Sequence, residues 1–149
     1  MTANDWRYLA GLFDGEGCVT VGIVKRKTSS RSGKAGNKIM NTSLRIANND
    51  PRVLLWLEEN FGGTVRQHSA TRVSWVWIAQ GDEAVQAAKQ LLKYSRMKKD
   101  QLENFIALMA LRGRGGVKIS DLEWDERQEL VDEIRASEFR RQDGLRLIS

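Results

Sequence analysis

Two carboxylates, Asp14 and Glu16, stand between glycines at the end of the run Leu-Ala-Gly-Leu-Phe-Asp-Gly-Glu-Gly, which occupies residues 9–17. Apolar residues before them recur at the spacing of one helical face and predict a helix over about 5–14. The two acids would lie at its C-terminal end, where carbonyl oxygens gather and negative charges repel unless a cation is present. Oxygen donors of this kind suit Mg²⁺, and a helix cap with two solvated acids is the alternative.

Two small residues, Ala10 and Gly11, lie inside this predicted helix. A glycine in a helix interior costs roughly 1 kcal/mol relative to alanine, so it usually marks a place where another backbone comes close. The sequence therefore predicts a partner helix against this one.

The nine residues together resemble, at nearly every position, the signature of the LAGLIDADG homing endonucleases. The signature occurs once, so the resemblance is to the single-motif members, which act as homodimers. It implies that Glu16 binds the catalytic metal with the carbonyl oxygen of Gly15. It also implies two or three Mg²⁺ ions at the dimer centre, with Mn²⁺ as a substitute and Ca²⁺ binding without cleavage. In such a dimer the two signature helices would pack together through Trp6, Leu9, Ala10, Gly11 and Phe13.

Composition favours an intracellular nucleic-acid-binding protein, because the 149 residues carry a formal net charge of +5 and 41% are apolar. We expect a single domain over residues 1–149, with a core of about 5–112 and a C-terminal helical extension of about 117–149. A lone cysteine, Cys18, excludes an intrachain disulfide and a cysteine-rich zinc site. No apolar N-terminal segment or membrane-length stretch is present, so no membrane partner is expected.

Basic residues concentrate between residues 19 and 80, and acidic residues concentrate after residue 117. Alternating polarity in the basic region predicts four strands, over 18–26, 41–46, 64–68 and 72–78. Helical periodicity predicts further helices over about 50–61, 82–94, 99–111 and 120–139, with an N-cap at Asp50 before Pro51 and a capping box from Ser120 to Glu123. The order αββαββα with an extra C-terminal helix is an α+β fold, and it is the order of the LAGLIDADG fold, whose four-stranded antiparallel sheet binds double-stranded DNA.

Several polar or basic residues are predicted to point from these strands toward DNA. They are Thr20, Arg26, Asn41, Ser43, Arg45, Arg66, His68 and Arg72. The segment 27–37 has the composition of a loop that closes over the DNA backbone or is purely structural. Trp75 and Trp77 share one face by alternation, and which face they occupy stays open, with burial favoured for at least one.

The resemblance implies three further catalytic residues. Asn48 and Arg52 match the positions that orient the attacking water, although a plain turn before Pro51 is an alternative for Asn48. Lys98 matches a lysine that places positive charge near the scissile phosphate, with Lys99 as the neighbouring alternative. The implied activity is Mg²⁺-dependent cleavage of both strands of a pseudo-palindromic DNA site of roughly 20 base pairs, leaving short 3′ overhangs. The alternatives are an intron maturase that acts on RNA and a DNA-binding protein that does not cleave.

Overall fold

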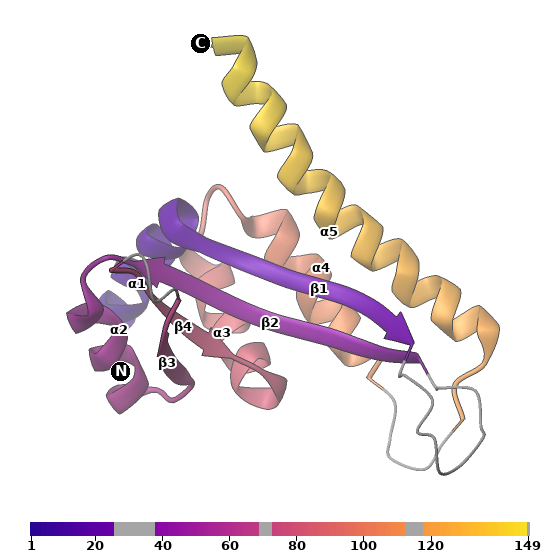
Figure 1. Cartoon of the computed structure of the whole chain (residues 1–149), viewed down its shortest axis with the longest axis horizontal. Helices are drawn as coiled ribbons and strands as arrows, with labels where there is room; N and C mark the ends of the chain where they lie inside the picture. The colour runs from indigo at the N-terminus through magenta and orange to yellow at the C-terminus, as the bar shows by residue number, and fades with distance from the viewer. Residues whose placement is uncertain (26–37, 69–72, 113–117, 149) are drawn as a thin grey trace.

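The structure, a computed structural model, describes residues 1–25, 38–68, 73–112 and 118–148, and side-chain surroundings up to residue 138. It is an α+β fold in which helices pack on a four-stranded antiparallel sheet (Figure 1). The fold class predicted from the sequence is therefore confirmed. In the described part of the chain, no helix is long and apolar enough to cross a membrane.

The first helix, α1 (Ala3–Glu16), is longer at both ends than periodicity predicts. Its start is fixed by a reciprocal cap, because the Asp5 amide donates to the Thr2 hydroxyl at 3.2 Å and the Thr2 amide donates to the Asp5 carboxylate at 2.8 Å. At the other end the chain passes directly from Glu16 into the first strand, so the acidic end of the signature run sits at a helix-to-strand junction.

The sheet has the strand order β1-β2-β4-β3, and each neighbouring pair is antiparallel. Its strands are β1 (Gly17–Lys25), β2 (Lys38–Asn48), β3 (Thr64–Gln67) and β4 (Trp75–Ala79). The predicted strand starting at residue 41 begins three residues earlier, and the predicted strand starting at residue 72 begins three residues later. The register places Gly17 opposite Ile46 and Asn48 opposite Trp75, so the ends of α1, β2 and the start of β4 meet at one end of the sheet.

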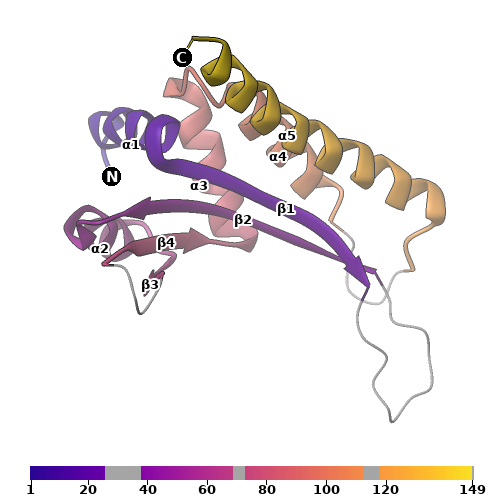
Figure 2. The same cartoon turned by 45° about the horizontal axis from the view of Figure 1, so that its top comes forward.

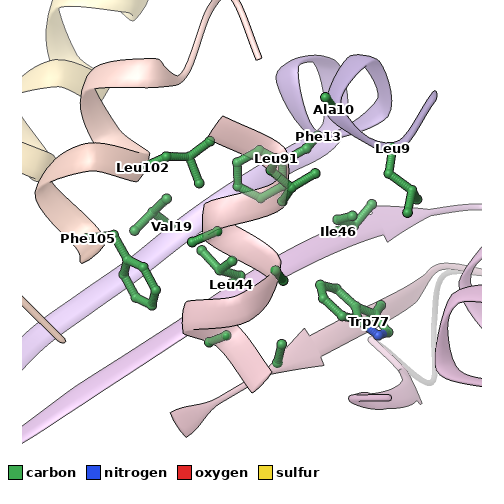
Figure 3. Close-up of a cluster of buried hydrophobic side chains, with 14 of the residues drawn as sticks. Leu9, Ala10, Phe13, Val19, Leu44, Ile46, Trp77, Leu91, Leu102 and Phe105 are labelled. Atoms are coloured by element: carbon green, nitrogen blue, oxygen red, sulfur yellow. The ribbon is translucent and has the colours of Figure 1, made fainter. Parts of the chain in front are cut away.

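One face of the sheet carries the hydrophobic core (Figure 3). Val19, Leu44 and Ile46 are almost fully buried there, and the side chain of Trp77 points into the same cluster. Trp75 shares this face by alternation and packs against the core, which settles the orientation that the sequence left open.

Four more helices complete the chain. They are α2 (Pro51–Asn60), α3 (Gly81–Tyr94), α4 (Lys99–Ala110) and α5 (Asp121–Ile148). Helix α3 crosses the inner face of the sheet, and α4 and α5 pack side by side beyond it (Figure 2). Among the described elements, no helix covers the opposite side of β1 and β2.

Helix α5 closes the edge of the sheet at β1. Val131 and Ile134 are fully buried, and the Arg135 guanidinium donates to the Val21 carbonyl at 3.0 Å. That carbonyl faces away from β2 on an edge strand, where an unpaired backbone group invites pairing with another chain. The C-terminal extension predicted as a helix therefore protects the sheet edge, and it continues nine residues beyond the predicted end at 139.

Candidate functional site

Glu16 and Asn48 line the same pocket, at the end of the sheet where α1 meets β2. The pocket has a volume of about 220 Å³, and its other lining residues are Ala47, Asn49 and Ser74. Glu16 and Asn48 were predicted site residues, whereas Ala47, Asn49 and Ser74 were not. No motif marks Ala47 or Ser74, and strand pairing brings them to the pocket, because Asn48 pairs with Trp75, the residue that follows Ser74.

Asn48 also shapes the turn before α2. Its amide oxygen Oδ1 accepts a hydrogen bond from the Asp50 amide at 2.9 Å, which fixes the orientation of the side chain. Because Oδ1 is used in the turn, the amide NH₂ is the group that can act on a ligand in the pocket. Asn48 therefore stabilises the turn and also lines the pocket, although the sequence presented these two roles as alternatives.

Arg52 lies outside this pocket. Its exposed guanidinium pairs with Asp50, with 2.6 Å between Nη2 and Oδ2. The hydrogen bonds from Arg52 lower the pKa of Asp50 to about 2. Asp50 caps α2 in addition, because its carboxylate accepts from the Arg52 amide at 3.0 Å.

The first acid of the pair, Asp14, is buried and holds the loop before α4. Its carboxylate accepts hydrogen bonds from the Ser95 hydroxyl and from the amides of Arg96, Met97 and Lys98. Burial raises the pKa of this carboxyl, but the hydrogen bonds from Arg96, Ser95 and Met97 outweigh it, so the pKa lies below the usual value for aspartate. Asp14 therefore fixes, as an ionised carboxylate, the loop that precedes α4.

Lys98, at the end of the same loop, contacts the backbone at the C-terminal end of α1. Its side chain is 5% exposed, and its ammonium donates to the carbonyl oxygens of Phe13, at 2.9 Å, and Gly17. These carbonyls flank the turn that carries Glu16, so Lys98 binds the negative end of the α1 dipole. It does not line the pocket, whereas its neighbour Lys99 is exposed. Lys98 therefore contacts the backbone around Glu16 and not the pocket that the Glu16 side chain lines.

Glu16 itself is exposed and makes no hydrogen bond or ion pair with the rest of the described chain. No group of three histidine, cysteine, aspartate or glutamate side chains within the described residues could hold a metal ion. Mg²⁺ is commonly held by one or two carboxylates and several waters, so Glu16 and the exposed Gly15 backbone fit part of such a site. Glu16 is the one carboxylate among the described residues that line the pocket.

The predicted dimer interface needs correction. Four of its five residues are buried in the core of their own protomer, because that face of α1 packs on α3 and the sheet. They are Trp6, Leu9, Ala10 and Phe13. Gly11 lies on the exposed side of α1 with Tyr8, Leu12 and Gly15, and a Cβ added at Gly11 would meet nothing within 4 Å.

Most of the predicted DNA-contacting residues that the structure describes are solvent-accessible. Thr20, Asn41, Arg45 and Arg66 alternate away from the core, and His68 follows β3 as an exposed residue. Arg26, Arg72 and the segment 27–37 lie outside the described residues. The prediction that Ser43 contacts DNA directly is wrong for this structure, because its side chain is 2% exposed beneath Arg45.

The comparisons with known proteins agree with this architecture. A family model described as LAGLIDADG endonuclease matches residues 9–107. The homing endonuclease I-CvuI, solved with its target in the presence of Ca, superposes with a TM-score of 0.74 at 19% identity, covering 91% of this chain and 82% of that one. Homing endonuclease I-TnaI gives a TM-score of 0.64 at 17% identity, with 96% and 97% covered. The archaeal intron-encoded I-Vdi141I, solved with DNA, gives 0.60 at 13% identity, with 91% and 98% covered. No curated protein sequence matches the chain.

Proposed function

Because the chain belongs to the LAGLIDADG endonuclease family, we propose that it is a homing endonuclease that binds a long duplex DNA site and hydrolyses both strands. The observation that carries this proposal is the pocket that joins Glu16 to Asn48 at one end of the sheet face left bare by the helices. An exposed carboxylate beside a carboxamide, at the end of a sheet face that carries Arg45 and Arg66, is suited to a phosphodiester and its hydrolytic water.

The proposed roles follow from the contacts of each residue. Glu16 and the Gly15 carbonyl would hold Mg²⁺, which supplies charge neutralisation at the phosphate and activation of water. The Asn48 amide NH₂, fixed by the turn at Asp50, would orient the water. Lys98 would act as a positioning residue, since it binds the carbonyls on either side of the Glu16 turn.

We propose that the active form is a homodimer joined through the exposed side of α1. Gly11 supports this, because alanine would stabilise the helix by roughly 1 kcal/mol and nothing in the described protomer occupies the space beside it. Tyr8 on the same side is 59% exposed, so its ring is available to a partner surface. Two copies would bring two Glu16 carboxylates together and complete the metal site.

A randomised duplex library tests the proposal. The purified protein is incubated with the library in Mg²⁺ or Ca²⁺, and the cut ends are sequenced. We expect double-strand cuts with short 3′ overhangs at one pseudo-palindromic family of sites in Mg²⁺, and binding without cuts in Ca²⁺. Binding without cuts in both metals would refute the endonuclease and favour a DNA-binding protein, while preference for RNA over duplex DNA would favour a maturase.

A further inference from the structure

The bare face of the sheet contains an apolar strip, formed by Ala47, Val76 and Ile78. Ala47 pairs directly with Val76, and Ile78 is the next outward residue on β4. Val76 is 7% exposed yet does not belong to the core cluster, because Trp77 beside it points to the core on the opposite face. The strip is thus a second, smaller apolar cluster on the side away from the helices, and Ala47 and Ile78 are its partly exposed members.

Arg45 lies at the border of this strip, because it pairs with Ile78 across β2 and β4. Its Nε donates to the Ser43 hydroxyl at 3.1 Å. Ser43 lies two residues nearer the far end of the hairpin, so the guanidinium is held along the strand, over Ser43. With Nε used in this way, the two terminal nitrogens Nη1 and Nη2 remain as a pair of parallel donors.

The charge of this face suits a polyanion. The outward positions of the four strands, as far as the structure describes them, include Arg45 and Arg66 and no carboxylate. At the β1 edge, a carboxylate oxygen of Glu138 of α5 lies 3.8 Å from the Cys18 sulfur. The acidic helix therefore bounds the surface on one side, and duplex DNA is the partner that the rest of the face fits.

We propose, building on the endonuclease function proposed above, that this face reads two features in each half-site. The apolar strip contacts the C5-methyl group of a thymine, and Arg45, aligned by Ser43, donates both terminal nitrogens to O6 and N7 of a guanine. Both groups are displayed in the major groove, where arginine suits guanine and apolar side chains suit the thymine methyl. Ser43 is then a positioning residue that acts through Arg45.

The strand geometry orders the two features. Ser43 lies five residues along β2 from Asn48, or about 17 Å at roughly 3.4 Å per residue. This corresponds to about five base pairs from the cleavage end at ~3.4 Å per base pair. The strip begins next to Asn48, at Ala47. The thymine is therefore expected closer to the cleavage centre than the guanine.

The test uses the site selected from a randomised library in Ca²⁺, where binding is measured without cleavage. We compare wild type with Ser43→Ala, Arg45→Ala and the double variant, and use Arg66→Ala as the matched control, because Arg66 lies on the same face without a serine partner. Ser43→Ala is expected to lower the preference for guanine about fivefold, the value of one hydrogen bond. It should add nothing in the Arg45→Ala background, and Arg66→Ala should leave this guanine preference intact.

The thymine contact is tested on the DNA. Deoxyuridine in place of the selected thymine removes only the methyl group and should weaken wild-type binding about fourfold. Ile78→Thr should abolish this difference, and because the deoxyuridine measurement needs no protein variant, it stands even if that variant folds poorly. Equal binding of thymine and deoxyuridine, or an unchanged guanine preference in Ser43→Ala, would overturn the inference. No enriched site at all would instead refute the proposed function.

Discussion

The two acids of the signature run have separate tasks in this structure, and exchanging each for its amide should reveal this. Asp14→Asn keeps one acceptor oxygen but replaces the other by an NH₂ group. Asp14 Oδ2 accepts from the Arg96 and Met97 amides, and Oδ1 accepts from Ser95 and the Lys98 amide. Turned one way, the new NH₂ group faces the part-buried Arg96 and Met97 amides, which lose their acceptor; turned the other way, it faces Ser95 and the Lys98 amide, which then has the Ser95 hydroxyl, at 3.3 Å, in place of the carboxylate.

In either orientation two hydrogen bonds to a charged acceptor are lost or weakened, and such bonds contribute about 1.5–3 kcal/mol each, so Asp14→Asn should lower the free energy of unfolding by about 3 kcal/mol. For a chain of 149 residues this corresponds to a Tm about 10 °C lower, at roughly 3 °C per kcal/mol. Glu16→Gln is the matched control: Glu16 is exposed, so its Tm should stay within about 2 °C of wild type. Cleavage should nevertheless be lost in Glu16→Gln, because the carboxylate proposed to hold the metal is gone.

The assay is thermal unfolding followed by circular dichroism at equal protein concentrations, since dimerisation makes Tm depend on concentration. The pH dependence of the free energy of unfolding gives a second test. The pKa of Asp14 is lowered in the folded protein, so its contribution to stability is present above the unfolded pKa and is lost as pH falls through the folded one. Wild type should lose stability over this acidic range more steeply than Asp14→Asn. An unchanged Tm in Asp14→Asn, or an equal loss in Glu16→Gln, would refute the division of tasks.

Three further predictions follow from named contacts. Gly63→Ala should lower the free energy of unfolding by about 3 kcal/mol, because Gly63 has a φ of +82° and an added Cβ would lie 2.4 Å from Trp77 Nε1. Chemical denaturation measures this loss, and a value below about 1 kcal/mol would contradict the prediction. Removing the partner of Asp50 by Arg52→Ala should return the pKa of Asp50 from about 2 toward 3.8, and an NMR titration that shows no rise would disprove the pairing. Tyr8→Glu should convert the proposed dimer to monomer with the fold intact, as measured by sedimentation; a dimer of unchanged affinity would exclude this side of α1 as the interface.

Much of the fold was predicted correctly from short-range signals in the sequence. Asp50 caps α2 before Pro51 as predicted, and the reciprocal bonds between Ser120 and Glu123 form the predicted capping box at the start of α5. Such signals are readable because the donor and acceptor lie within three residues of each other. The strands were likewise readable from alternation, although their ends shifted by about three residues because pairing with a neighbouring strand, rather than the residue pattern, decides where a strand stops.

The errors come from contacts that are distant in sequence. Periodicity placed Trp6 and Phe13 on one face of α1 correctly, but it does not say whether that face meets the same protomer or a second copy. Alternation placed Ser43 on the outward face, and its burial follows from the conformation of the Arg45 side chain. Likewise, the partners of Asp14 lie 81 to 84 residues further along the chain, so no local pattern could separate its task from that of Glu16.

Cleavage of the selected DNA site by wild type and Glu16→Gln, side by side in Mg²⁺ and in Ca²⁺, tests the central claim most directly. We expect double-strand cleavage by wild type in Mg²⁺ alone, with Glu16→Gln folded and bound to the same site in Ca²⁺ but unable to cut. Cleavage by Glu16→Gln at the wild-type rate would contradict the account, because it would place the metal-dependent chemistry outside the pocket that Glu16 and Asn48 share.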